Sequence, residues 1–202
     1  MEQRTDEWFA ARLGKVTASR VADVVAKNKN GYGASRENYM AQLICERLTG
    51  KPTEMFSSAA IEWGTQTEPQ ARAAYSAKTG ELVEEVGFIP HHSIPGSGAS
   101  PDGFVGDALI EIKCPNTATH LEYVLSGKPP EKYVTQMQWQ MAVTGAPYCE
   151  FVSYDPRLPE HLQMLIVRIP RDESRIAELE DEVRKFLGEL EDKLKQLEKV
   201  KL

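Results

Sequence analysis

Cysteine is scarce in this sequence, and its three cysteines are widely separated. They stand at positions 45, 114 and 149 of 202 residues, with no Cys-x-x-Cys spacing. Disulfide frameworks and zinc or iron–sulfur sites need several cysteines at short, regular spacings, so the sequence encodes neither. We expect Cys45, Cys114 and Cys149 to be buried, reduced thiols.

Long apolar stretches are absent as well. No window of the sequence approaches the roughly 18 uninterrupted apolar residues that mark a membrane-spanning helix. Residues 1–14 are charged and helical in pattern, without the basic and then apolar layout of a signal peptide. We therefore expect a cytoplasmic protein that has no membrane partner.

The sequence also lacks the basic surplus that most DNA-binding domains carry. Its formal net charge is −6, and residues 56–170 contain thirteen Asp or Glu against seven Lys or Arg. Divalent cations can offset such a local acidic excess. The charge argues against the simplest form of nucleic-acid binding and leaves a metal-dependent function open.

Repeats and low-complexity tracts are missing too, and the length predicts one domain over residues 1–202. Apolar residues at helical spacing and alternating apolar residues predict the elements. The expected helices are 5–14, 17–25, 35–50, 57–80, 117–127 and 130–146, and the expected strands are 81–92, the segment around Phe104, 108–114, 148–155 and 162–170. This order predicts an α/β fold in which helices flank a central mixed β-sheet of about five strands.

Three segments have special features. Gly64 and Pro69 lie inside the helix expected over 57–80 and predict a kink or a break there. Residues 171–202 predict a long C-terminal helix, which either packs on its own domain or contacts a second subunit or partner. Residues 27–34 predict a flexible basic loop with Tyr32 exposed.

Two carboxylates and an amine surround the short strand expected over 108–114. Successive side chains of a strand point to opposite faces, so Glu111 and Lys113 share one face and Ile112 points into the core. Asp102 lies in a Pro-Asp-Gly turn that a short strand pair can bring back beside Glu111. Two converging carboxylates repel one another unless a cation lies between them, and Mg²⁺ suits such oxygen ligands.

This set suits phosphodiester hydrolysis, because Lys113 can hold a metal-bound water or stabilise charge that develops on phosphorus. The structural alternative is a salt bridge between Glu111 and Lys113 at a strand end, with Asp102 acting only as a turn former. The pattern of these three residues alone leaves both interpretations open.

Further residues extend the pattern, and together they resemble a known family. The string P-D-x8-E-I-K-C-P (101–115) and the late Y-D-P-R (154–157) are similar to the phage lambda exonuclease and YqaJ-type viral recombinase family, within the restriction-endonuclease-like PD-(D/E)xK nucleases. The resemblance runs from about residue 6 to residue 190. The upstream residues that match in order and spacing are Trp8, Arg12, Leu13, Gly14, Thr17, Ala18, Ser19, Trp63, Gly64 and Glu68.

The resemblance implies a 5′-to-3′ exonuclease with a restriction-endonuclease-like core. Such an enzyme degrades one strand of linear duplex DNA from a 5′-phosphorylated end, releases mononucleotides and leaves a 3′ single strand for recombination by annealing. It uses two Mg²⁺ per active site, for which Mn²⁺ substitutes. The resemblance further implies a homotrimeric ring, a single-strand annealing protein as partner, and a phage- or prophage-encoded protein in a bacterial host.

The resemblance also assigns roles to residues of the metal site. It makes Asp102, Glu111 and the backbone carbonyl of Ile112 metal ligands, and Lys113 the partner of the attacking water. Glu68 would hold the second metal or its waters, and its structural alternative is a solvated carboxylate on a helix.

A second group of residues is assigned to the DNA. Arg12, Ser19 and Ser100 would seat the terminal 5′-phosphate, since a guanidinium binds phosphate in bidentate fashion. Their structural alternatives are an exposed helix charge for Arg12 and a helix cap for Ser19. Lys27, Lys29 and Tyr32 would contact DNA ahead of the site, although Lys29 stands where the family leads us to expect Arg, so loop-mediated end melting stays open.

The glutamines of the helix expected over 130–146 cannot all face the same way. Gln136 and Gln138 are two residues apart and point in different directions, whereas Gln140 lies one turn beyond Gln136. Gln136 matches the family position and is expected to support the catalytic residues, while the role of Gln138 stays open. The tryptophans Trp8, Trp63 and Trp139 are expected in the core rather than as platforms for bases.

Three other functions remain as alternatives. The first is a structure-specific endonuclease of the same fold, and the second is a non-catalytic DNA-end-binding accessory protein of recombination. The third is an α/β domain that binds a small anionic metabolite.

Overall fold

The computed structural model describes residues 2–29, 31–53 and 58–200. The helices within these ranges are α1 (Asp6–Arg12), α2 (Ala18–Val24), α3 (Ala34–Thr49), α4 (Ala59–Thr79), α5 (Thr117–Ser126), α6 (Glu131–Thr144) and α7 (Glu173–Leu197), with a 3₁₀ turn over Glu160–Leu162. The strands are β1 (Val16–Thr17), β2 (Lys27–Asn28), β3 (Gly31–Tyr32), β4 (Ile89–Pro90), β5 (Ser97–Ala99), β6 (Gly103–Val105), β7 (Ala108–Lys113), β8 (Tyr148–Tyr154) and β9 (Met164–Pro170). The α/β class and the long C-terminal helix are therefore confirmed.

The main sheet has the strand order β6-β7-β8-β9 and is mixed. β6 pairs antiparallel with β7, β7 pairs parallel with β8, and β8 pairs antiparallel with β9. An isolated bridge between Glu84 and Phe104 adds a single residue pair beside β6. We expected about five strands in the central sheet, and in the described part of the chain this sheet has four strands and one isolated bridge.

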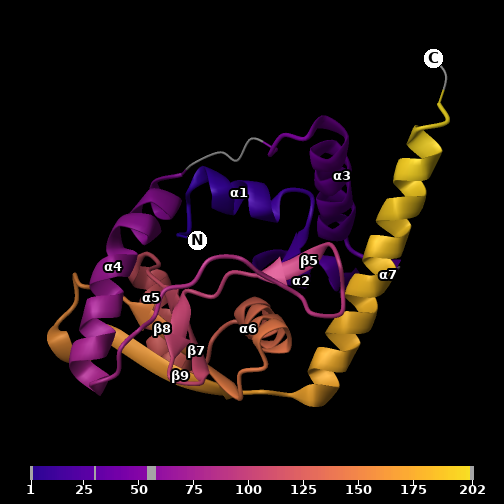
Figure 1. The fold of residues 1–202 in the computed structure, drawn as a ribbon. Helices are drawn as coiled ribbons and strands as arrows, with labels where there is room; N and C mark the ends of the chain where they lie inside the picture. The colour runs from indigo at the N-terminus through magenta and orange to yellow at the C-terminus, as the bar shows by residue number, and fades with distance from the viewer. Residues whose placement is uncertain (1, 30, 54–57, 201–202) are drawn as a thin grey trace.

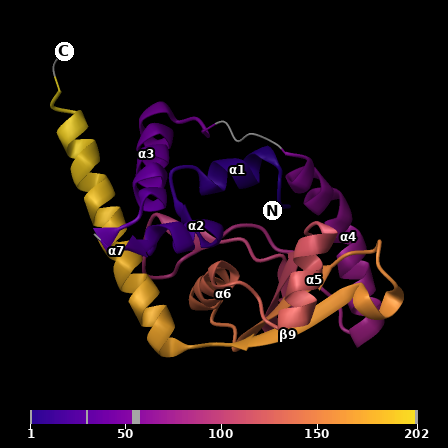
Figure 2. The same ribbon diagram turned by 180° about the vertical axis from the view of Figure 1, so that it is seen from behind.

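Helices cover both faces of this sheet. Residues Ala71 and Tyr75 of α4 pack with Ile110 and Ile112 of β7 on one face. On the other face, Leu109 packs with α6, through residues that include Met137 and Met141. Figures 1 and 2 show α4 and α5 on opposite sides of the sheet, and α6 between the sheet and α7. This alternation along β7 confirms the predicted two-faced strand and buries Ile112.

A second part of the core lies beyond α6 and contains a smaller sheet. Here β5 pairs parallel with β1 and antiparallel with β4. One cluster of buried side chains joins α2, α3, α6 and α7, and Trp139 of α6 is completely buried in it. The apolar side of α7 packs into the same cluster through residues that include Leu179 and Phe186, so the helix packs on its own domain over most of its length.

Three expectations about local structure were wrong or only partly right. The helix α4 runs without interruption through Gly64 and Pro69, because burial of its later turns against the sheet offsets the backbone hydrogen bond that proline lacks. Only Ile89 and Pro90 of the segment 81–92 form a strand. Cys45 is exposed on α3, whereas Cys114 and Cys149 are buried free thiols as expected. Within the described residues, no helix is both long and apolar enough to cross a membrane.

Candidate active site

A β-hairpin brings Asp102 back to the end of β7. The strands β6 and β7 pair antiparallel, with Gly103 opposite Ile110. In this arrangement Asp102 Oδ2 accepts a hydrogen bond of 2.6 Å from the backbone N–H of Ile112. The proposed convergence of Asp102 with Glu111 and Lys113 therefore exists in the fold, and the backbone of β7 fixes one oxygen of Asp102.

Close backbone packing holds the turn that carries Asp102. A Cβ atom on Gly103 would collide with the Val83 side chain and would lie 3.0 Å from the Glu84 carbonyl oxygen. On the other side of the turn, a Cβ atom on Gly98 would collide with the Ile89 carbonyl oxygen. Glycine at both positions therefore lets the neighbouring segments approach closely on either side of the turn.

Glu111 is buried, with 1% of its surface exposed, and it is held from three directions. Gln136 of α6 donates from Nε2 to Glu111 Oε1 at 2.7 Å, and Gln140 donates from Nε2 to Glu111 Oε2 at 2.6 Å. The Lys113 ammonium donates to Glu111 Oε1 in a short ion pair. Gln136 thus contacts the carboxylate of Glu111, while its supporting role in catalysis stays a prediction, and Gln140 adds a contact that the sequence interpretation did not assign.

The charges of this cluster shift each other's protonation. Burial raises the pKa of Asp102 well above its usual value, and the nearby charge of Glu111 raises it further. Burial alone would lower the pKa of Lys113, but the charges of Glu111 and Asp102 outweigh it, and the net shift is upward. Lys113 therefore stays protonated. Its single positive charge faces two acidic groups, Asp102 and Glu111.

The donor set fits a hard divalent cation in part. Asp102 Oδ1 has no hydrogen-bond partner among the described residues. Burial and the negative charges of its acidic neighbours destabilise the ionised form of Asp102. Magnesium in proteins binds one or two carboxylates and keeps several waters, and Asp102 with Glu111 meets that requirement. In the described ranges, however, no group of three or more His, Cys, Asp or Glu side chains forms a ready-made metal site.

Glu68, the candidate ligand of a second metal, lies near the cluster and contributes to the raised pKa of Asp102. Both of its oxygens are engaged by guanidinium groups. Arg4 contacts Oε2 at 2.7 Å and Arg72 contacts Oε1 at 2.9 Å. In this arrangement arginines provide the positive charge at Glu68, so the structure supplies no free carboxylate for a second metal at this position.

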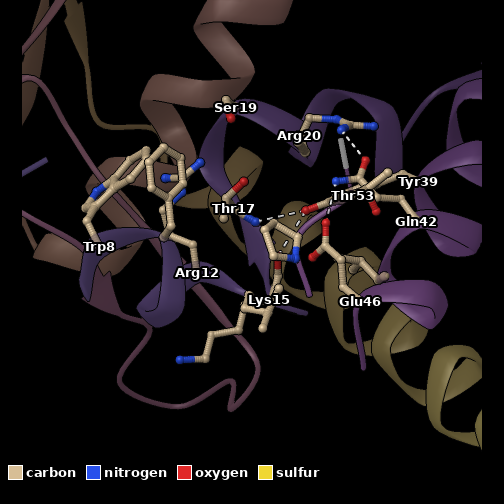
Figure 3. Close-up of a pocket in the computed structure, with 14 residues that line it drawn as sticks. Trp8, Arg12, Lys15, Thr17, Ser19, Arg20, Tyr39, Gln42, Glu46 and Thr53 are labelled. Atoms are coloured by element: carbon tan, nitrogen blue, oxygen red, sulfur yellow. Dashed lines mark hydrogen bonds between the residues drawn. The ribbon is translucent and has the colours of Figure 1, made fainter. Parts of the chain in front are cut away.

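Two residues of a cationic cavity, Trp8 and Arg12, contact Ser100, which precedes Asp102 by two residues. Ser100 Oγ accepts hydrogen bonds of 3.0 Å from both Trp8 Nε1 and Arg12 NH1. The Arg12 guanidinium lies 4.0 Å from the centre of the Trp8 ring. Figure 3 draws the two side chains beside each other. Trp8 is thus a partly exposed partner of Arg12 rather than a core residue.

Arg12 has the surroundings of an anion-binding group. Its guanidinium makes no ion pair with a described carboxylate, and it donates a hydrogen bond to the neutral Ser100 hydroxyl. Burial lowers the pKa of Arg12, although Tyr39 and Glu46 partly oppose the shift. A half-buried cation without a direct counter-ion is stabilised by an anionic ligand.

The cavity at Arg12 has a volume of about 570 Å³. Its lining combines apolar, cationic and hydroxyl side chains. Figure 3 draws the lining side chains, most of which come from α1, α2 and α3. Ser19 of α2 lines the cavity with an exposed side chain, as the phosphate hypothesis requires. The predicted phosphate residues Arg12, Ser19 and Ser100 therefore lie in one region of the surface.

The predicted loop over 27–34 contains a small antiparallel hairpin of β2 and β3. Its Lys27 and Tyr32 contact Glu182 of α7, with distances of 2.9 Å from Lys27 Nζ and 2.6 Å from the Tyr32 hydroxyl. Lys29 is exposed at the turn, whereas Asn30 lies outside the described residues. The structure thus brings Lys27 and Tyr32 together on α7, away from the Asp102 cluster, and their contact with DNA stays a prediction.

The Tyr-Asp-Pro-Arg string encodes a junction between three elements. Asp155 is fully buried and accepts hydrogen bonds from Thr117 at 2.7 Å and from Arg157 Nε at 2.7 Å. The Arg157 guanidinium lies 4.2 Å from the centre of the Trp63 ring of α4 and donates to the Pro115 carbonyl. This junction ties the end of β8 to the exit of β7 and to the helix that carries Glu68.

Fold and site together define a mixed α/β protein with a cluster of Asp102, Glu111 and Lys113 and a cationic cavity at Arg12. The family model of the YqaJ-like viral recombinase domain matches residues 7–147. The chain therefore belongs to the YqaJ-like viral recombinase family, as the sequence motifs predicted. A comparison with curated proteins found no match.

Solved structures agree with this assignment. An alkaline exonuclease (LHK-Exo) from Laribacter hongkongensis is 58% identical, with a TM-score of 0.91 and 96% of each chain covered. A structure of LHK-Exo in complex with dAMP is 60% identical over the same shares, with a TM-score of 0.90. A phage-related exonuclease from Haemophilus somnus 129PT shares the fold at 15% identity, with a TM-score of 0.66 and coverage of 89% of this chain and 96% of that one. The family match and the two LHK-Exo structures support a nuclease of the viral recombinase family.

Proposed function

We propose that this protein is a Mg²⁺-dependent exonuclease that degrades one strand of linear duplex DNA in the 5′-to-3′ direction. It would start at a 5′-phosphorylated end, release mononucleotides and leave a 3′ single strand for annealing. The observation that carries the proposal is the convergence of the half-buried Asp102 and Lys113 on the buried Glu111, together with the contact of Ser100 with Arg12 of the cavity. The relationship to an alkaline exonuclease supports the same reaction class.

The cavity would bind the end of the DNA. Arg12 offers a guanidinium that forms no ion pair with the carboxylates in the described part of the chain, and the hydroxyls of Ser19 and Ser100 lie in the same region. Guanidinium groups bind phosphate through paired, charge-assisted hydrogen bonds. Because Ser100 precedes Asp102 by two residues, a terminal phosphate at Arg12 would direct the next phosphodiester toward the Asp102 cluster.

Asp102, Glu111 and the carbonyl of Ile112 would hold the cation at that phosphodiester. A bound Mg²⁺ lowers the pKa of its water and offsets charge on the phosphoryl oxygens. Lys113 keeps its proton and donates hydrogen bonds, so its charge would stabilise the negative charge that develops on phosphorus. Gln136 keeps the Glu111 carboxylate in place while the phosphodiester reacts.

A second Mg²⁺ is part of the proposal only if Glu68 leaves its arginine partners. Arg4 is largely exposed, with 47% of its side chain accessible, and an exposed ion pair of this kind is weak. Exchange of the Arg4 contact for a cation would free one oxygen of Glu68. We expect Mn²⁺ to replace Mg²⁺, because both ions accept carboxylate and water ligands.

The proposal extends to the partners of the protein. Lys27, Lys29 and Tyr32 would contact the duplex ahead of the site, and three copies of the chain would form a ring around the DNA. A ring with a basic lining is compatible with the net charge of −6, because field lines concentrate in a channel. A single-strand annealing protein would receive the 3′ strand, and co-purification with such a protein tests this part.

The reaction is tested on linear duplex DNA with one 5′-phosphorylated end and one 5′-hydroxyl end, each strand carrying its own label. With Mg²⁺, mononucleotides should leave the phosphorylated strand first, and EDTA should stop their release. Covalently closed circular duplex should stay intact, because it has no end. Equal degradation of the circle would favour an endonuclease, and no hydrolysis with Mg²⁺ or Mn²⁺ would favour a binding protein.

A further inference from the structure

Three glutamines of α6 are buried, and their side chains contact two different parts of the structure. Gln136 and Gln140 are one helical turn apart and therefore share a face, and both donate to Glu111. Gln138 points elsewhere: its Nε2 donates to the Pro170 carbonyl at 2.8 Å, and its Oε1 accepts from the N–H of Asp172 at 3.0 Å. Gln138 therefore joins α6 to the start of α7.

Gln140 is unusual because only half of its amide is satisfied. The residue is completely buried, and its Oε1 has no hydrogen-bond partner in the described part of the chain. A buried oxygen without a partner lowers stability, whereas a methionine of similar length would fill the space without this loss. The amide orientation is fixed by Glu111, since a flipped amide would turn oxygen toward oxygen. The side chain therefore serves the carboxylate rather than the packing of the core.

The donors around Glu111 occupy its two oxygens unequally. A carboxylate has about four acceptor positions. Gln136 and Lys113 both donate to Oε1, whereas Gln140 is the donor to Oε2 among the described residues. Gln140 thus fixes the oxygen that retains an acceptor position, and without it the carboxylate would pivot about its contacts at Oε1.

We propose that Gln140 is a positioning residue that orients the Glu111 carboxylate for cation binding. The inference deepens the proposed function and rests on it. Residues that hydrogen-bond a metal ligand change metal affinity or activity by about 10- to 100-fold. Gln140 would act through Glu111 and would touch neither the cation nor the DNA.

The test compares Gln140→Met with Gln138→Met, a matched change two residues away on the same helix. Mn²⁺ binding is measured without DNA by electron paramagnetic resonance and calorimetry, together with thermal unfolding and with kcat and KM on linear duplex. Gln140→Met should weaken Mn²⁺ binding and lower kcat by about 10- to 100-fold, with KM for DNA and the melting temperature preserved. Gln138→Met should lower the melting temperature and leave Mn²⁺ affinity unchanged.

Two outcomes would overturn the proposal. One is a Gln140→Met variant that binds Mn²⁺ and turns over DNA like the wild type, and the other is an equal loss of Mn²⁺ affinity in Gln138→Met. Gln140→Leu serves as a second variant if methionine packs poorly. An inactive wild-type protein would instead contradict the proposed function, which separates the two failures.

Discussion

At the scale of single residues, Lys113 connects the two acidic groups of the cluster. Its ammonium pairs with Glu111, and the charges of Glu111 and Asp102 raise its pKa above the usual value. Gln136 and Gln140, the other described donors to Glu111, are neutral. If Lys113 lost its charge, neither of them could replace it. The charge at this position is therefore the feature to test first.

Lys113→Met should lower Mg²⁺-dependent nucleotide release by at least about 10²–10³-fold, because removal of a pre-positioned donor to the transition state has an effect of this size. DNA binding should remain measurable, since Arg12 and Ser100 are unchanged. The matched control is Lys132→Met, which alters an exposed lysine that lies 4.8 Å from the Tyr133 ring. A Lys113→Met enzyme with the wild-type rate would remove this residue from the mechanism.

Asp155 gives a prediction for pH dependence. Burial raises the pKa of this carboxyl, but hydrogen bonds from Arg157 and Thr117 outweigh burial and lower the pKa to about 2. A folded-state pKa below the unfolded value stabilises the native state above the unfolded pKa, and this contribution disappears as pH falls toward 2. Asp155→Asn should therefore lower the free energy of unfolding by about 2 kcal/mol at pH 7.

The measurement is denaturant unfolding of wild type and Asp155→Asn between pH 7 and pH 2. The difference between the two proteins should shrink through the acid range. Asp107→Asn, which changes an exposed carboxylate in the turn between β6 and β7, serves as the control. A stability difference that stays constant down to pH 2 would contradict the role of the Asp155 charge.

The sequence predicted the site residues that depend on local geometry. Alternation along β7 places Glu111 and Lys113 on one face, and the turn at Asp102 is readable from its Pro and Gly neighbours. The partners from distant segments were not predictable, because no local pattern links Arg4 to Glu68 or Trp8 to Ser100. Gln140 could have been found from its helical spacing to Gln136.

At the scale of elements, the hairpin of β2 and β3 is fastened to α7 by a small set of polar contacts. Glu182 accepts hydrogen bonds from Lys27 and Tyr32, and the Lys185 ammonium donates to the Tyr32 hydroxyl at 3.0 Å. The Arg36 guanidinium lies 3.9 Å from the centre of the Tyr32 ring. Because several of these groups are exposed, we expect the hairpin to open more readily than the core.

Glu182→Gln should weaken this attachment, because the ion pair with Lys27 is lost and the hydrogen bond from Tyr32 becomes weaker. Hydrogen exchange of residues 27–33 should become faster, while the melting temperature changes little. Glu178→Gln, one turn earlier on α7 and paired with Arg175, is the control. Unchanged exchange of the hairpin in Glu182→Gln would show that other contacts hold it.

Element boundaries were predictable where local signals and burial agree. Gly50 and Gly80 end α3 and α4 in the left-handed conformation, which glycine adopts without strain. The segment 81–92 alternates like a strand, but most of it lacks a neighbouring strand and stays irregular. Gly64 and Pro69 predicted a kink or a break, yet α4 continues through both residues, and its later turns pack against the sheet. Tertiary contacts decided both cases, and a sequence window does not contain them.

At the scale of the whole molecule, α6 is the element that joins the two parts of the core. Its Met137 and Met141 pack against the main sheet, whereas Trp139 packs with α2 and α7. Trp139 also donates to the Gly98 carbonyl of β5 at 3.2 Å, just before Ser100 and Asp102. The helix that holds Glu111 therefore also fixes the strand that leads to the cavity and to the cluster.

The proposed ring gives a prediction for the protein in solution. Analytical ultracentrifugation should show a particle with three times the mass of one chain. On long linear duplex with excess unlabelled DNA as a trap, the trimer should continue to release nucleotides from the strand that it has begun. A monomer that releases nucleotides equally well would contradict the ring, while leaving the cluster of Asp102 and Glu111 untouched.

The central claim is that the cluster of Asp102, Glu111 and Lys113 hydrolyses DNA with the help of a divalent cation. Its most direct test is nucleotide release from 5′-phosphorylated linear duplex by wild type and by Asp102→Asn, each with Mg²⁺ and with EDTA. The account predicts release by wild type with Mg²⁺ alone and no release in the other three reactions. Full activity of Asp102→Asn, or of wild type in EDTA, would contradict it.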